Sequence, residues 1–260
     1  MPRIKLTLEY DGTNFAGWQR QPRKRTVQGV LEEALGRLCG HEVRTTGAGR
    51  TDAGVHAAGQ VAHFDLNAPR SPRQIILGGN EHLPPDVAVV GAEPVPDDFD
   101  ARRDAIARHY RYTLLARRAR PAWMRTCVGH THYDLDEVRV RRGLAVLQGR
   151  HDFRAFRSAE CEAPRTDLEL AVTLTREGDL WVFDFHARSF LHHMIRLLIG
   201  ALIELGRGRL EPARLRAMLD GGEPRPDWIP NAPASGLCLM SVEYPPLQPG
   251  ARSPGRRRRP

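Results

Sequence analysis

This sequence of 260 residues is poor in cysteine and almost devoid of lysine. The four cysteines stand far apart, at positions 39, 127, 161 and 238. A chain of this length can bury enough apolar surface to fold without covalent cross-links, so isolated thiols indicate reduced cysteines and a cytoplasmic protein. No CxxC or HExxH motif is present, and His192-His193 has no cysteine or carboxylate frame in the sequence, so no metal site is expected.

Long apolar runs are also missing. No stretch approaches the ~18 apolar residues that a membrane span requires, so none is expected. The first residues, MPRIKLTLEYDG, contain neither a continuous apolar segment nor a small-residue cleavage site, which argues against a signal peptide. A hydrophobic share of 41% and a charged share of 27% are typical of a soluble globular protein.

The positive charge is carried by 37 arginines, and it is unevenly distributed. The formal net charge of +8 divides into −2 for residues 1–100, +5 for residues 101–245 and +5 for residues 246–260. Residues 102–125 alone hold eight arginines against Asp104. Guanidinium groups bind phosphate well, so the pattern suggests a polyanionic partner that meets mainly the second half. A genome whose codons favour arginine over lysine would explain the choice of cation equally well.

Apolar periodicity predicts strands mixed with helices. Strands are expected at 4–10, 60–66, 87–95, 108–116, 168–175, 180–188 and 237–244. Helices are expected at 27–38, between a Thr26 cap and Gly40, and at 72–79, 135–147, 190–205 and 211–219. The helix at 190–205 is almost entirely apolar and should be deeply buried. The short turn at residues 177–179 joins two strands into a hairpin, and the whole indicates an α+β fold with an antiparallel sheet.

The segment with the most chemical potential is GAGRTDAGVH, residues 47–56. Three glycines within eight residues allow a tight turn and the close approach of a ligand. The segment is not a dinucleotide fingerprint, because Asp52 stands where the third glycine belongs, and it is not a P-loop, because no Gly-Lys-Ser/Thr follows. Asp52 could act there as a nucleophile, a general base or an ion-pair partner, or could simply accept hydrogen bonds from its own backbone.

The sequence resembles the tRNA pseudouridine synthase A family. The stretch GAGRTDAGVHAAGQVAHFD is similar to the family's catalytic signature, and EYDGTNFAGWQRQ and TVQGVLEEAL are similar to its opening. NEHLPPDVAV, VPDDFDAR, ARHYRYTLL, DFRAFRS, FLHHMIRLLIGAL and GLCLMSVEYP follow in the family's order. The resemblance covers about residues 4 to 244 and leaves only the basic tail outside.

The resemblance implies a role for four residues. The family's nucleophile is the Asp of GRTD, here Asp52, and Arg50 of the same motif is expected near the flipped nucleotide. The aromatic residue that packs on the target uracil is the first Tyr of YRY, here Tyr110. The basic partner of the catalytic Asp lies in HHMIR, here Arg196.

The resemblance also implies an architecture and a substrate. The family fold has two ferredoxin-like α+β halves that form a continuous mixed, mainly antiparallel sheet flanked by helices, with the active cleft between the halves. The expected domains are residues 1–104 with the catalytic loop, residues 105–245, and a disordered basic tail, 246–260. Members act as homodimers on uridines 38, 39 and 40 of the tRNA anticodon arm, without cofactor or metal.

The chemistry of pseudouridine formation suits these residue types. The N1–C1′ bond breaks, the uracil turns, and a C5–C1′ bond forms, so no atoms are gained or lost. A carboxylate at C1′ follows the logic of glycosidases, but the sequence leaves open whether Asp52 adds to C1′, attacks the uracil ring or removes a sugar proton. An arginine close to Asp52 would keep the carboxylate ionised, and a flipped base requires an aromatic platform.

Simpler explanations exist for the same residues. Tyr110 lies on an alternating strand, a position that is also typical of a core tyrosine. Arg196 interrupts an apolar helix, where a structural ion pair would also place it. Three tryptophans are expected in the core rather than against RNA: Trp18, Trp123 and Trp181.

Two other functional classes stay open at this point. A metal-dependent nuclease would use Asp52 together with further carboxylates, but none stands beside it in the sequence. A tRNA-binding protein without activity would keep the arginine-rich stretches and tolerate the loss of Asp52.

Overall fold

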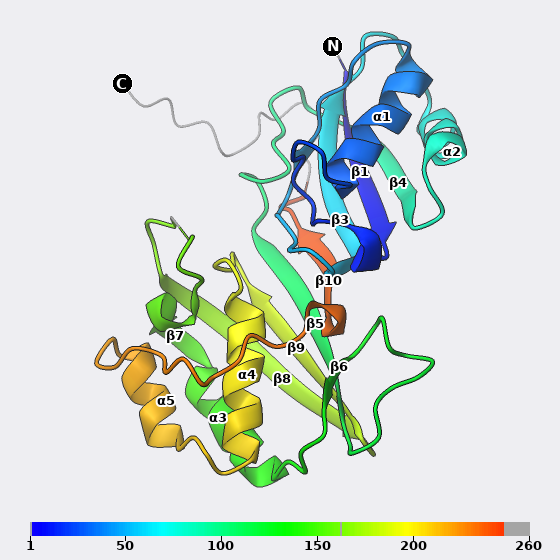
Figure 1. Cartoon of the computed structure of the whole chain (residues 1–260). Helices are drawn as coiled ribbons and strands as arrows, with labels where there is room; N and C mark the ends of the chain where they lie inside the picture. The colour runs from blue at the N-terminus through cyan, green and yellow to red at the C-terminus, as the bar shows by residue number, and fades with distance from the viewer. Residues whose placement is uncertain (1, 162, 247–260) are drawn as a thin grey trace, which may run out of the picture. The chain divides into compact units, whose positions relative to one another are not determined.

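The computed structural model describes residues 2–161 and 163–246. Within them lie ten strands and five α-helices, which group into two compact units (Figure 1). The first unit comprises Met1–Arg108 together with the chain from Leu239 on, and the second comprises His109–Cys238. The first unit is therefore discontinuous in sequence, because the last strand joins it after the second unit is complete.

The first unit is an antiparallel sheet with two helices. Its elements are β1 (Arg3–Tyr10), α1 (Val27–Cys39), β2 (Thr46–Gly47), β3 (His56–Asp65), α2 (Pro72–His82), β4 (Val87–Val95) and β10 (Leu237–Glu243). The strand order is β4-β1-β3-β10, and β2 pairs with β3. The expected alternation holds in β1, where Ile4, Leu6, Leu8 and Tyr10 are buried.

The helix ends of the first unit follow the predicted capping chemistry. The Thr26 hydroxyl accepts a hydrogen bond from the Gly29 amide, and Gly40 ends α1 in the left-handed conformation at φ 74°. α2 begins with a capping box between Ser71 and Gln74. It continues beyond residue 79, where the sequence predicted its end. Gly78 serves close packing instead of a stop, since a Cβ there would lie 2.6 Å from the Leu38 side chain of α1.

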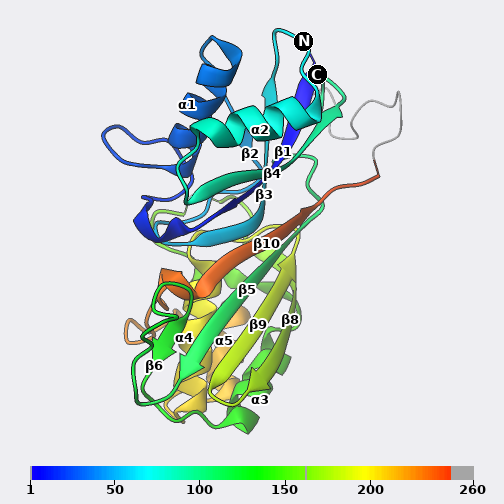
Figure 2. The same ribbon diagram turned by 90° about the vertical axis from the view of Figure 1, so that its right-hand side faces the viewer.

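The second unit also combines a sheet with helices. Its elements are β5 (Ala107–Ala116), β6 (Gly129–Thr131), α3 (Glu137–Leu147), β7 (Gly149–Asp152), β8 (Asp167–Glu177), β9 (Leu180–Ala187), α4 (Met194–Gly206) and α5 (Pro212–Leu219). The strand order is β5-β9-β8-β7, and β6 runs parallel to β5. β8 and β9 form the predicted hairpin, with Gly178 at φ 58° in its turn. The helices α3, α4 and α5 lie on one face of β5, β8 and β9 (Figure 2).

α4 is the buried helix that the sequence predicted, but it starts later. All its residues except Arg196 are buried. The predicted start at residue 190 is wrong, because His193 adopts the left-handed conformation at φ 65° and the helix begins only at Met194. α3 likewise begins at Glu137, after the Asp136 carboxylate accepts hydrogen bonds from the amides of Val138 and Arg139.

The predicted fold class is confirmed as an α+β fold of two halves, with mixed, mainly antiparallel strands flanked by helices. The division into domains 1–104 and 105–245, the ferredoxin-like character of each half and a cleft between them stay predictions. All four cysteines are free thiols, as expected. In the described chain, no helix has the length and apolar character needed to cross a membrane. The predicted disordered tail, 246–260, lies outside the described residues except for residue 246.

Candidate functional site

Asp52 lies on the loop between β2 and β3, residues 48–55, here called the Asp52 loop. Its backbone is fixed along its length: the Ala48 amide donates to the Val61 carbonyl at 2.7 Å, and the Gln60 side-chain amide donates to the Gly49 carbonyl at 2.9 Å. The Val55 amide donates to the Asp52 carbonyl at 3.1 Å and closes a turn at Asp52 itself. The loop therefore holds a defined backbone path at the residue that carries the carboxylate.

The side chain before Asp52 adds a buried anchor. The Thr51 hydroxyl lies 2.8 Å from the hydroxyl of Tyr10, and both residues are buried. Tyr10 comes from the end of β1, so the loop is tied to a second strand as well as to β3. Asp52 is thus restrained through its chain neighbours, a precondition for a precisely placed catalytic group.

A second segment, residues 11–18, packs directly on the Asp52 loop. The Trp18 amide donates to the Thr51 carbonyl at 3.0 Å, and the Gly54 amide donates to the Phe15 carbonyl at 3.3 Å. Gly17 has φ 93°, and a Cβ there would lie 2.7 Å from the Thr51 carbonyl oxygen. A Cβ at Gly12 would lie 2.0 Å from the Val55 carbonyl oxygen. The packing of residues 11–18 on the Asp52 loop was not predicted from the sequence, although the two glycines of DGTNFAG indicate a close backbone contact.

Asp11 and His56 form a polar contact at the end of the same loop. The Gly12 amide donates to His56 Nδ1 at 3.1 Å, and Asp11 Oδ1 lies 3.1 Å from the same nitrogen. Partial burial raises the pKa of Asp11, but hydrogen bonds from Thr13 and the nearby His56 outweigh it, so its pKa lies below the usual value. This pair was not predicted either, because nothing in the sequence separation of Asp11 and His56 indicates contact.

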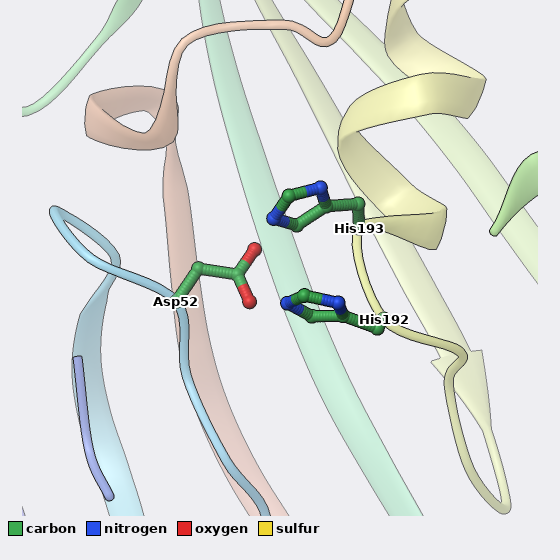
Figure 3. A group of neighbouring side chains, drawn as sticks. All are labelled: Asp52, His192 and His193. Carbon is green, nitrogen blue, oxygen red and sulfur yellow. The ribbon is translucent and has the colours of Figure 1, made fainter. Parts of the chain in front are cut away.

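The two predicted residues of this loop differ in exposure. Asp52 is half-buried, and its side chain extends from the loop that precedes β3 (Figure 3). Arg50 is exposed and makes no ion pair or hydrogen bond with any residue in 2–161 or 163–246. The guanidinium of Arg50 is therefore available to an external anion such as a phosphate.

Tyr110 lies in β5 within the second unit and is buried, with 8% of its surface exposed. Its ring meets Phe190 edge-to-face, with centroids 5.1 Å apart and an interplanar angle of 80°. Tyr112 is on the same side of the strand, and its hydroxyl donates to the Pro233 carbonyl at 3.0 Å. Burial raises the pKa of Tyr112, and the charge of Arg196 opposes this shift.

Arg196 is half-buried in the first turn of α4. Its Nε donates to the Ala232 carbonyl at 2.8 Å, while its own carbonyl accepts from the Ala232 amide at 3.1 Å. This two-way contact joins the helix to the segment 231–233, which also carries the carbonyl that Tyr112 binds. Because Nε of Arg196 already donates to a backbone carbonyl, hydrogen bonds from the guanidinium to other partners come from its two terminal nitrogens.

His192 and His193 form a pair just before α4 (Figure 3). Their ring centroids are 4.1 Å apart with a tilt of 36°. His192 Nδ1 lies 2.6 Å from the Ser158 hydroxyl, and His193 Nδ1 lies 3.1 Å from the Asn231 side-chain nitrogen. Each imidazole is thus oriented by a hydrogen bond within the second unit.

The comparisons with known proteins decide the family. A model described as tRNA pseudouridine synthase matches residues 7–104 and 144–245. The chain belongs to this family. The predicted assignment to a family of isomerases is therefore confirmed.

Relatives in the pseudouridine synthase family match nearly the whole chain. A tRNA pseudouridine synthase A of Methylobacterium sp. (strain 4-46) is 49% identical over 253 residues, which span 96% of this chain and 100% of that protein. The proteins of the same name from Methylobacterium nodulans and Chromobacterium violaceum are 48% and 47% identical, each over 94% of this chain. The matches cover 97% and 93% of those proteins.

The pseudouridine synthase family model matches two stretches of the chain and leaves the residues between them unmatched. Arg50, Asp52 and Arg196 lie inside the matched residues, whereas Tyr110 lies in the unmatched stretch between residues 104 and 144. Within each unit, the structure groups Arg50 with Asp52 on one loop, and it places Tyr110 and Arg196 in the second unit.

The tryptophans separate into two groups. Trp18 and Trp181 are buried, as the sequence predicted. The same prediction is wrong for Trp123, which is 84% exposed. Its neighbours explain the error: it follows Pro121 in a loop without a strand or helix pattern, so no apolar face exists to bury it.

Proposed function

We propose that this chain converts uridine to pseudouridine at positions 38, 39 and 40 of the tRNA anticodon arm, with Asp52 as nucleophile and without a cofactor. The membership in the tRNA pseudouridine synthase family supports the reaction and the tRNA substrate. The anticodon positions rest on the resemblance of the sequence to tRNA pseudouridine synthase A. The observation that carries the proposal is the half-buried carboxylate of Asp52 on a loop tied to β1, β3 and residues 11–18.

The reaction balances without any external reactant. The N1–C1′ bond breaks, the C5–C1′ bond forms, and the proton that leaves C5 is matched by one taken up at N1. A carboxylate stabilises the electron-poor C1′ whether by covalent addition or by charge. The remaining task of the protein is to hold a flipped uridine against Asp52 and to exclude competing positions.

Three further residues take supporting roles in this proposal. Tyr110 packs on the target uracil, and its edge-to-face contact with Phe190 fixes the plane of its ring. Arg196 pairs with the catalytic carboxylate, and its Nε contact with Ala232 fixes the side chain. Arg50 binds a phosphate beside the flipped nucleotide, because its guanidinium is exposed and lacks a partner among the described residues.

Tritium release tests the reaction directly. A tRNA transcript labelled with tritium at uracil C5 is incubated with the protein in the presence of a chelator. We expect tritium in water from an intact RNA chain, and a loss of at least about 10³-fold in rate for Asp52→Ala with tRNA binding retained. Asp97→Asn, an exposed acid of the same unit, is the control and should release tritium normally.

The outcomes separate the alternatives. Cleavage of the RNA that depends on added metal would indicate a nuclease, and binding without release would indicate a tRNA-binding protein. Release that Asp52→Ala leaves unchanged would overturn the role of Asp52. Transcripts with a single labelled uridine at position 38, 39 or 40, against one labelled elsewhere, test the proposed positions.

We further propose that the protein works as a homodimer in the cytoplasm. The dimer rests on the family resemblance, and the cytoplasm rests on the tRNA substrate and the four free thiols. Sedimentation equilibrium measures the first point, and a mass equal to one chain at micromolar concentration would contradict it.

A further inference from the structure

The connection between β5 and β6, residues 117–128, carries an exposed aromatic residue. This segment, here called the 117–128 loop, extends away from the strands of the second unit (Figure 1). Trp123, at 84%, is more exposed than any other large hydrophobic side chain in the described part of the chain. Single exposed apolar residues are common on protein surfaces, so a binding role needs support from the surroundings.

The charge around Trp123 provides that support. Residues 117–128 contain four arginines and no acid. Arg118, Arg120 and Arg125 are not buried, and none makes an ion pair or hydrogen bond with another residue of the described chain. Two other exposed arginines of this unit, Arg150 and Arg154, are paired with acids, whereas Arg142 and Arg216 are also without such partners in the described chain. The three guanidinium groups of the loop are thus available to an external polyanion.

The loop presents Trp123 on an ordered backbone. The Arg117 amide donates to the Thr131 carbonyl at 3.0 Å, and His130 Nε2 lies 2.9 Å from the Arg117 carbonyl. The Cys127 amide donates to the Met124 carbonyl at 3.0 Å and closes a turn next to Trp123. An ordered loop loses little conformational entropy when it binds.

A cavity of about 230 Å³ adjoins the indole. Leu115 and Leu180 contribute to its apolar lining, and its charged lining consists of two acids, Glu177 and Asp179, and one cation, Arg117. The two carboxylates outnumber the one guanidinium and so disfavour a phosphate in the cavity, but they can accept hydrogen bonds from the exocyclic amine of a base. Phosphates are therefore expected at the arginines of the loop and a base beside Trp123.

We propose that the 117–128 loop binds an unpaired stretch of the tRNA substrate, at a place separate from the target uridine. One base stacks on Trp123, and the neighbouring phosphates bind Arg118, Arg120 and Arg125. An aromatic face beside cationic side chains is the usual arrangement for unpaired nucleic acid. The choice of tRNA as ligand rests on the proposed function.

A membrane surface would also attract arginine and tryptophan. The loop contains no amphipathic helix, and Trp123 is its only exposed large apolar residue. Its apolar area is therefore too small for a stable anchor, and RNA is the favoured ligand.

Affinity measurements on the full chain test the proposal. Fluorescently labelled tRNA is titrated with the wild type, Trp123→Ala, Trp123→Phe and Val138→Ala, an exposed apolar truncation on α3 of the same unit. We expect Trp123→Ala to raise Kd about tenfold, because the stacking of one base is removed. Trp123→Phe should largely restore binding, and Val138→Ala should have no effect. At saturating tRNA, Trp123→Ala should release tritium at the wild-type rate, because the loop binds and does not catalyse.

A fully paired RNA duplex serves as the second probe. It offers phosphates but no unpaired base, so Trp123→Ala should bind it as the wild type does. Equal Kd values of wild type and Trp123→Ala for tRNA would overturn the proposal, as would an equal weakening on the duplex. Loss of binding to anionic vesicles without a change in tRNA affinity would assign the loop to a membrane instead.

The failure of this proposal differs from the failure of the proposed function. A wild type that releases no tritium from tRNA contradicts the proposed function, whatever Trp123 does. Normal release together with an unchanged Kd for Trp123→Ala contradicts only the role of the loop.

Discussion

The Asp52 loop and the 117–128 loop differ in how the protein holds them. The Asp52 loop has few large side chains, and contacts with two strands hold its backbone. Residues 11–18 also pack on it, with Gly12 and Gly17 at the points of closest approach. The 117–128 loop is tied mainly at its ends and displays Trp123 and its arginines outward. A group that must meet one carbon atom needs a fixed position, whereas groups that bind a flexible polyanion need access and charge. Two sets of variants probe this difference between a fixed site and an accessible one, and two further sets test contacts of the second unit outside its loop.

Gly12→Ala should be the most damaging change. The new Cβ would lie 2.0 Å from the backbone oxygen of Val55, so one of the two loops must move. We expect a loss of roughly 2–4 kcal/mol in the free energy of unfolding and a strong fall in kcat. Gly79→Ala is the control in the same unit, since its Cβ would come no closer than 3.6 Å to its neighbour Val89. Urea unfolding and tritium release measure the two effects, and a Gly12→Ala protein with wild-type kcat would show that the Asp52 loop tolerates displacement.

Neutralising the 117–128 loop should act on affinity alone. In a triple variant, Arg118, Arg120 and Arg125 are each changed to Gln, and the slope of log K against log salt for tRNA should become less negative by about 1 for each phosphate that is no longer neutralised. The kcat at saturating tRNA should stay unchanged. Arg50→Gln is the comparison in the Asp52 loop, where we expect a smaller change in slope and a fall in kcat. If both variants changed kcat alike, the contrast between the loops would be wrong.

Tyr112→Phe tests the support of Arg196 in the second unit. The change removes a hydrogen bond from a buried tyrosine to the Pro233 carbonyl, so we expect a loss of about 1 kcal/mol in the free energy of unfolding. Since Pro233 adjoins the residue that holds Arg196 Nε, kcat should fall more than KM changes. Tyr133→Phe is the control, because in the described chain its hydroxyl makes no hydrogen bond to the segment 231–233. If Tyr112→Phe lowered the stability but left kcat unchanged, the hydrogen bond between Tyr112 and Pro233 would not be needed to position Arg196.

The smallest effect is expected for Asp184 in the sheet of the second unit, as a change in how stability depends on pH. Partial burial raises the pKa of Asp184, but hydrogen bonds from Arg111 and His109 outweigh it and hold the pKa below its usual value. The stabilisation is therefore present above the unfolded-state pKa and is lost as the pH falls through the lower folded-state pKa. Asp184→Asn should flatten the acid limb of stability, measured by urea unfolding between pH 7 and about pH 3. Asp179→Asn, at an exposed position of the same unit, is the control.

Local chemistry determined which parts of the fold the sequence could predict. The start and end of α1 followed from Thr26 and Gly40, because caps are made within a few residues. Three short strands, β2, β6 and β7, were not predicted, since two to four residues show no period. The start of α4 was misplaced because the left-handed conformation of His193 has no signal in an apolar pattern.

The site was predictable only in part. The resemblance supplied Asp52, Arg50, Tyr110 and Arg196, and the roles of all four stay predictions. The packing of residues 11–18 on the Asp52 loop could not be inferred, because it joins two segments more than 30 residues apart in the sequence. The prediction for Trp123 was wrong, since tryptophan is usually buried and its exposure here depends on a loop with no apolar face behind it.

The position of β10 in the sheet has a consequence for folding during synthesis on the ribosome. β10 lies beside β3, and the approach is so close that a Cβ at Gly59 would lie 2.3 Å from the Met240 carbonyl oxygen. During synthesis β1 to β4 emerge early, but the part of this β3 edge that β2 does not cover stays open until β10 has been made. An open strand edge is prone to mispairing with other chains. The first unit therefore becomes complete only when β10, its last strand, has been made. A ribosome stalled shortly before residue 237 would leave a fully translated Asp52 loop on a sheet that lacks this strand.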